Sequence, residues 1–130
     1  MTKGEVRKVP MYINAADMGY TLTVTGTVQS FISAALVHVR KNAATFLTSF
    51  FGSPVLGVAT FIATYASAAF SSLAVKKGKT GIAVIYEVTC VEQVKHQAGQ
   101  EFTYLDWRLT GISVRWYEEV GKDKIIDGEE

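Results

Sequence analysis

Residues 20–29 alternate between polar and apolar side chains, and this alternation predicts a β-strand. Threonine occupies every second position from Thr21 to Thr27, with tyrosine, leucine and valine among the residues between. A period of two with β-branched side chains is typical of a strand with one buried face. Residues 1–19 show no such period and contain proline and glycine, so we expect an irregular N-terminal arm there.

From residue 30 the pattern takes the period of a helix. Polar side chains recur at spacings of four, three and four, which places them on one helical face. These side chains are His38, Asn42, Thr45 and Ser49. We therefore expect a helix over residues 31–51. Gly-Ser-Pro at 52–54 then breaks it, because glycine suits the end of one helix and proline the first turn of the next.

A second helix is predicted over residues 54–75. Small and hydroxyl-bearing side chains recur along one face with the same spacing, and large apolar side chains occupy most of the rest. The small stripe consists of Gly57, Thr60, Thr64, Ser67 and Ser71. The large apolar set is Val58, Phe61, Ile62, Tyr65, Phe70 and Leu73. Small side chains permit another helix to approach closely. The polar stripes of the two helices either meet across a hairpin, or they face solvent or another copy.

The remainder of the chain is predicted to form antiparallel strands. Residues 82–90 alternate, and the additional apolar residues Ala83 and Ile85 indicate that this strand begins buried on both faces. After a polar turn at 93–100, residues 102–119 supply one long strand or two. The apolar phase slips by one residue at Thr110, which predicts a β-bulge. Residues 121–130 are expected to be a flexible, solvated tail.

The order of these elements predicts an α+β fold in one domain of 130 residues. A small antiparallel sheet of three to four strands, with its later strands in 82–117, carries an apolar helical hairpin, residues 30–75, inserted after the first strand. The hydrophobic fraction of 48% and charged fraction of 19% are typical of a folded protein.

The candidate chemistry is sparse. A net charge of +1 gives no general attraction to nucleic acid, and a single cysteine, Cys90, excludes an intramolecular disulfide. His38 and His96 lack metal-ligand spacing, so no metal or other cofactor is expected. Cys90, His96 and Asp106 form the only nucleophilic set we considered, but Cys90 shares its strand face with buried apolar residues. The sequence therefore favours a non-catalytic protein and leaves the compartment open.

Residues 43–75 contain no charged side chain. A helix over 55–75 would be about 30 Å long, which matches both the hydrocarbon core of a bilayer and a small domain. A helix that is apolar nearly all round has to be covered on every side, and this short chain is expected to leave one flank exposed.

Three functions follow from this exposed flank. We favour a self-assembling, homo-oligomeric structural protein that buries the helix between subunits. A membrane-associated or membrane-inserting protein of the pore-forming or bacteriocin kind is the first alternative, and an enzyme or ligand-binding domain without a recognisable motif is the second. The expected contact residues are Gly57, Thr60, Phe61, Ile62, Thr64, Tyr65, Ser67, Phe70, Ser71 and Leu73.

Overall fold

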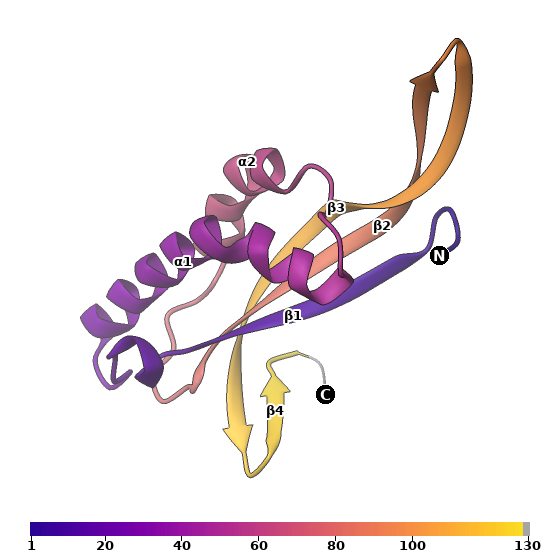
Figure 1. The fold of residues 1–130 in the computed structure, drawn as a ribbon. Coiled ribbons are helices and arrows are strands. Elements are labelled where there is room, and N and C mark those ends of the chain that lie inside the picture. Colours follow the sequence, from indigo (N-terminus) through magenta and orange to yellow (C-terminus); the bar gives the residue numbers. More distant parts are fainter. Residues whose placement is uncertain (129–130) are drawn as a thin grey trace.

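The computed structural model describes residues 1–128, which fold as a four-stranded antiparallel sheet with two helices on one face (Figure 1). The strand order is β1-β2-β3-β4. The elements are β1 Val6–Asn14, a short 3-10 turn η1 Ala16–Met18, α1 Thr25–Phe51, α2 Val58–Ser71, β2 Gly81–Gln97, β3 Gln100–Val120 and β4 Asp123–Ile126. The predicted α+β fold, with a helical hairpin after the first strand, is confirmed.

The first strand is β1, and the predicted strand at 20–29 is wrong. The N-terminal segment that was predicted to be irregular contains β1. Every second residue of this strand, Val9, Met11 and Ile13, is buried in the core. Pro10 interrupts this pattern in the sequence, but an edge strand tolerates proline because one side of its backbone needs no partner. Residues 20–24 turn instead, and α1 begins at Thr25.

The first helix is longer than expected at its start and ends where predicted. Its buried side chains recur at helical spacing from the first turn, which is why residues 25–30 join the helix rather than a strand. They are Val28, Phe31, Ala35, Val39, Ala43 and Leu47. Gly52 ends the helix in the left-handed conformation, φ 75°, with its N–H donating to the Thr48 carbonyl.

The second helix has 14 residues and is shorter at both ends than the predicted 54–75. Residues before it extend the sheet: the Leu56 N–H donates to the Trp107 carbonyl, and the Leu109 N–H donates to the Leu56 carbonyl. Backbone groups used in this way cannot also form a helical turn. The helix therefore starts only at Val58, after Gly57.

β2 and β3 form one long twisted ribbon. Glu87 pairs with Gly111 and Val88 pairs with Leu109, so the pairing skips Thr110 and the predicted bulge is confirmed. β3 is a single strand. The predicted turn at 93–100 is too wide, because the strands continue to Gln97 and resume at Gln100. The half of the ribbon next to the helices is buried, and the other half extends past them (Figure 1).

The predicted flexible tail, residues 121–130, contains β4. That prediction is wrong for residues 121–128, and residues 129–130 lie outside the described residues. β4 pairs with the end of β3 and places Ile126 in a small cluster with Ala83, Ile85 and Tyr117 on the sheet face opposite the helices. This cluster confirms that β2 begins buried on both faces.

Lys76 and Lys79 form ion pairs with Asp127, the residue that follows β4. Each ammonium lies 3.1 Å from the Asp127 carboxylate. Partial burial by itself would raise the pKa of Asp127, but hydrogen bonds from the two lysines outweigh it and hold the pKa below its usual value.

Candidate interaction surface

The predicted contact residues of α2 fall into two groups. Ile62 and Phe70 are 4% and 3% exposed and point into the core with Val58 and Ala66. The chain itself therefore encloses two of the ten predicted residues. Phe61 and Leu73 are half-buried at the margin of the core. The remaining six predicted residues, Gly57, Thr60, Thr64, Tyr65, Ser67 and Ser71, are exposed.

The exposed side of α2 forms a surface that we call the α2 flank. It consists of Ala59, Thr60, Ala63, Thr64, Tyr65, Ser67, Ala68 and Ser71. No member is charged, and Tyr65 is the largest, at 52% exposed. Exposed helical faces commonly carry charged side chains, whereas this face carries only alanine, serine, threonine and tyrosine.

Three of the five hydroxyls of the α2 flank have hydrogen-bond partners within the chain. Thr64 donates to the Thr60 carbonyl at 2.8 Å, and Ser71 donates to the Ser67 carbonyl at 2.9 Å. Ser67 in turn accepts a 2.7 Å bond from the Arg40 guanidinium of α1. Because these groups keep their partners when water is removed, covering the flank costs less than covering free hydroxyls.

The polar stripes of the two helices do not meet across the hairpin. His38 and Asn42 of the α1 stripe instead line a hollow beside β1, together with Thr45. Arg40 to Ser67 is the contact that connects α1 to the α2 stripe. The α2 stripe faces outward, which was one of the two sequence alternatives.

Two shallow grooves border the α2 flank. One, of about 550 Å³, lies between α2 and β3 and contains Phe61 and Tyr65, whose rings are 4.6 Å apart, with Arg108 at its rim. The other, of about 270 Å³, lies between the helices, where alanines leave room and Arg40 forms the rim. Five of the ten predicted contact residues line the first groove: Gly57, Thr60, Phe61, Thr64 and Tyr65.

The two cations at these rims form no ion pair within the described part of the chain. Residues 18–86 contain no aspartate or glutamate. Within the described part of the chain, the ion pairs involve other groups: Lys3, Arg7, Lys76 and Lys79. Arg40 and Arg108 therefore border the α2 flank as cations without carboxylate partners among residues 1–128.

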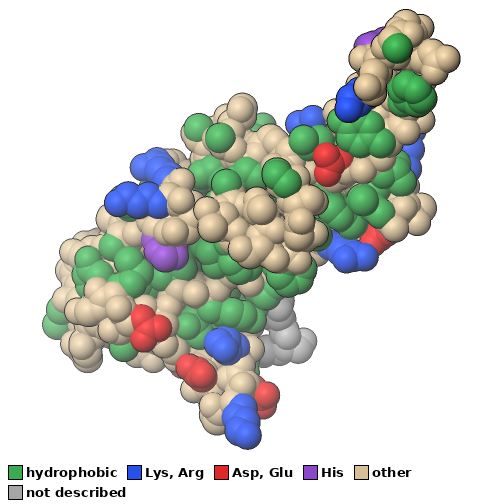
Figure 2. Space-filling model, viewed as in Figure 1, with side chains coloured by type: hydrophobic (Ala, Val, Ile, Leu, Met, Phe, Trp, Pro, Cys, Tyr) green, Lys and Arg blue, Asp and Glu red, His purple; other side chains and the backbone are tan. Residues whose placement is uncertain are grey.

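The far half of the β2–β3 ribbon is a second exposed surface. We call residues 91–106 the arm, and Figure 2 shows hydrophobic side chains gathered on it. Phe102 is 50% exposed and Tyr104 46% exposed, and with Val94, Lys95 and Gln97 they line a hollow. Residues 102–119 were predicted as strand, but the extension of the hairpin past the helices was not predicted. The one signal for it is length, because β3 has 21 residues whereas β1 has 9.

The candidate catalytic and metal-binding side chains do not converge. Cys90 is buried, and His96 lies six residues further along the same strand, about 20 Å away. The register pairs His96 with Glu101 and places Asp106 opposite Val91. Among residues 1–128 no group of three or more His, Cys, Asp and Glu side chains is suitably placed for a metal.

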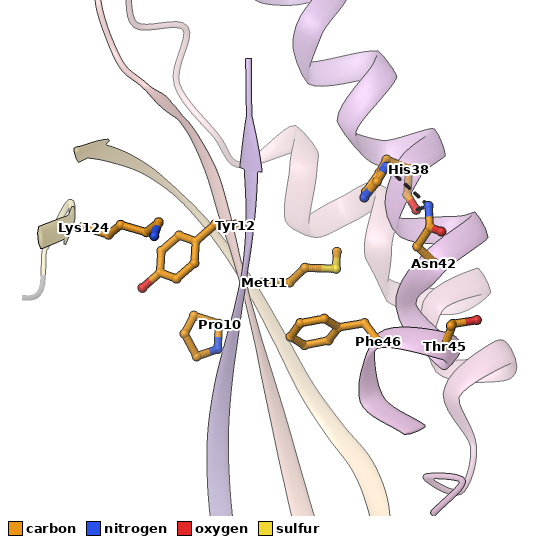
Figure 3. Close-up of a pocket in the computed structure, with 8 residues that line it drawn as sticks. All are labelled: Pro10, Met11, Tyr12, His38, Asn42, Thr45, Phe46 and Lys124. Carbon is orange, nitrogen blue, oxygen red and sulfur yellow. Dashed lines mark hydrogen bonds between the residues drawn. The ribbon is translucent and has the colours of Figure 1, made fainter. Parts of the chain in front are cut away.

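The side chains that line the hollow beside β1 come from both sides of that strand. Figure 3 shows Tyr12 and Lys124 on one side of β1 and His38 and Asn42 on the other. The Lys124 ammonium lies 5.2 Å from the centre of the Tyr12 ring. The Asn42 amide donates to the His38 carbonyl at 2.9 Å. Each polar group is thus occupied on its own side of the strand.

Two further findings bear on function. Over the described residues, the helices are too short or too polar for any of them to cross a bilayer. Comparison of the chain with protein-family models, with curated proteins and with solved structures found no match, so its own surface is the basis for assigning a function.

Proposed function

We propose that this protein is a non-catalytic structural subunit that assembles with copies of itself by burying the α2 flank. The observation that carries the proposal is that eight exposed residues on one helix include no charge. The centres of protein interfaces are depleted of charged residues, whereas the surfaces of soluble monomers are rich in them.

The chemistry of the α2 flank suits close packing against protein. Alanines at 59, 63 and 68 allow a partner to approach the helix backbone. Tyr65 supplies a large ring that is a frequent anchor in interfaces, and the adjoining groove exposes part of Phe61. The internally bonded hydroxyls lower the cost of excluding water.

The test is the mass of the protein in detergent-free buffer over a range of concentrations, measured by light scattering. We expect species larger than the 14.2 kDa chain. Tyr65→Asp should shift them toward the monomer, because it removes the large aromatic anchor from the centre of the contact. Because Tyr65 is exposed, the circular dichroism and the melting temperature of the variant should be nearly those of the unmodified protein.

Val120→Asp is the matched control. Val120 is also an exposed apolar residue, 58% exposed, but it lies beside the β3–β4 turn. This variant should assemble like the unmodified protein. A 14.2 kDa particle at every concentration up to several hundred micromolar would overturn the proposal.

A membrane surface is the second candidate for what covers the α2 flank. Residues 18–86 carry five basic and no acidic side chains, and a basic surface with an apolar face suits anionic lipid. Co-sedimentation with vesicles of anionic and of neutral lipid separates the two candidates. Self-assembly predicts that the sedimented fraction is the same with and without either kind of vesicle. An increase with anionic vesicles that is sensitive to salt and that Tyr65→Asp removes selects the membrane.

A further inference from the structure

The arm lacks the support that a two-stranded hairpin needs. Beyond Cys90, β2 pairs only with β3, because the pairing of β1 with β2 ends at Val6 and Thr89. Isolated hairpins are marginally stable in water unless a further strand or a packed face supports them. Val94, Phe102, Tyr104 and Leu105 are between 37% and 50% exposed, so the arm has an apolar surface to offer.

We infer that the arm of one copy packs across the α2 flank of a second copy, an inference that rests on the proposed self-assembly and names the surface that covers the flank. The arm and the flank have matching lengths. Seven residues of extended strand span about 23 Å, and the 14 residues of α2 span about 21 Å. In this arrangement the hollow lined by Phe102 and Tyr104 receives side chains of the α2 flank of the second copy.

The chain cannot make this contact with itself. The arm projects from the end of the ribbon away from α2, as Figure 1 and Figure 2 both show. The free edge of β1 is a poor alternative site for a neighbouring strand. Pro10, in the middle of β1, has no N–H to donate to an added strand.

Charge distinguishes this arrangement from packing of one α2 flank on another. Flank against flank would bring together Arg40 and Arg108 of both copies with no carboxylate in the helical layer. The arm instead carries three carboxylates against one lysine: Glu92, which pairs with Lys3 of its own chain at 2.9 Å, and Glu101 and Asp106, which form no ion pair among the described residues. Opposite charges at the rim of an interface favour the correct partner and orientation.

The contact joins two different surfaces, so it is heterologous. Each copy offers one arm and one flank, and repetition of such a contact gives a ring or a filament, unless two copies exchange arms reciprocally. Unmodified copies use both surfaces and continue to assemble, whereas a copy that lacks one surface ends the assembly at a dimer.

Mixing two defective variants tests the inference. Phe102→Asp with Tyr104→Asp disables the arm and leaves the flank intact, whereas Tyr65→Asp disables the flank and leaves the arm intact. Each preparation alone should lose self-association by roughly 30-fold or more, as expected for loss of an aromatic anchor. An equimolar mixture should restore binding as a dimer, because one intact arm then meets one intact flank.

The outcomes separate the inference from the proposed function. If the arm variant assembles like the unmodified protein, or the mixture stays monomeric although each variant is folded, the inference is overturned and self-assembly through the flank can stand. If the unmodified protein is itself monomeric, the proposed function fails.

Disulfide trapping provides a test that does not depend on how the aspartates affect the arm. Phe102→Cys and Ala63→Cys, made as separate proteins and mixed, should form a mixed disulfide between chains under mild oxidation. Phe102→Cys mixed with Val120→Cys is the matched control, and the native Cys90 is only 1% exposed. Equal yields from the two mixtures would contradict the inference.

Discussion

Gly81 shows how closely β1 and β2 approach at the point where the sheet begins. A Cβ atom at this position would collide with the Ile13 carbonyl oxygen and lie 3.0 Å from the Asn14 Cα. Both obstacles are backbone atoms, so neither can turn aside as a side chain can. The glycine therefore lets β1 and β2 pair at this end of the sheet, where the register joins Asn14 to Gly81.

Gly81→Ala should reduce the free energy of unfolding by about 1–3 kcal/mol, the range found for overpacked sites. Gly26→Ala is the matched control. Gly26 lies in the first turn of α1, where its Cβ would meet no described atom within 4 Å. Alanine there should be neutral or stabilise by up to about 1 kcal/mol. Urea unfolding of both variants checks the pair, and equal stabilities would contradict the proposed close contact.

At the scale of elements, the spacing of polar and apolar residues predicted the helices. It failed where a helical pattern and a strand pattern overlapped in the same residues. The polar stripe from His38 to Ser49 has helical spacing, and it predicted the helix over residues 31–51. Its first turn was hidden because threonines at alternate positions resemble a strand, although Val28 already belongs to the helical face. β1 was missed because an edge strand with Pro10 shows only three buried positions.

Contacts that are remote in sequence explain the other failures. The end of the chain looks solvated because charges surround Ile126, and only its docking under Ala83 and Ile85 makes it part of the fold. The shortened start of α2 depends on Leu56 bonding to β3, a contact between residues about fifty positions apart. The exposed flank of α2 was predictable, because the absence of charge from 43 to 75 does not depend on tertiary structure.

α1 begins without a side-chain cap, which offers a prediction at the scale of this helix. Val24 is the N-cap residue with extended backbone, φ −128° and ψ 149°, and its side chain is 56% exposed. Val24→Asp should stabilise the protein by about 0.5–2 kcal/mol, because the carboxylate accepts free N–H groups of the first turn and faces the positive end of the helix dipole. Thermal unfolding measures the gain, and Val24→Ala, which supplies no acceptor, should not reproduce it.

The ion pairs between Asp127 and the two lysines predict that the stability of the fold depends on pH. Because the pKa of Asp127 is lowered in the folded protein, the folded state binds fewer protons than the unfolded state near that pKa. The stabilisation is therefore complete above the ordinary carboxyl pKa of about 3.9 and is lost as the pH falls through the lower folded value. Urea unfolding between pH 2 and 7 should show that Asp127→Asn reduces stability at pH 7 and weakens its loss in acid. Parallel pH profiles for both proteins would contradict the role of Asp127.

On the scale of the whole molecule, the ribbon of β2 and β3 has two halves with different surroundings. Helices and β4 enclose the half near Ile82, Tyr86 and Trp116, whereas the arm projects without cover (Figure 1). A fold that requires only a core would not need the second half. The same chain thus presents an apolar projection and an uncharged helix flank on different parts of its surface.

This division predicts how amide hydrogen exchange depends on concentration. In the dilute protein, arm amides should exchange rapidly and those of residues 82–88 slowly, because only the latter lie under a packed core. Raising the concentration should slow exchange in the arm and in α2 and leave residues 82–88 unchanged, since assembly covers only the first two. Tyr65→Asp should abolish this concentration dependence. Slow exchange throughout the arm of that variant would mean that the hairpin is stable unaided, and its exposed aromatic residues would then imply no need for a second copy.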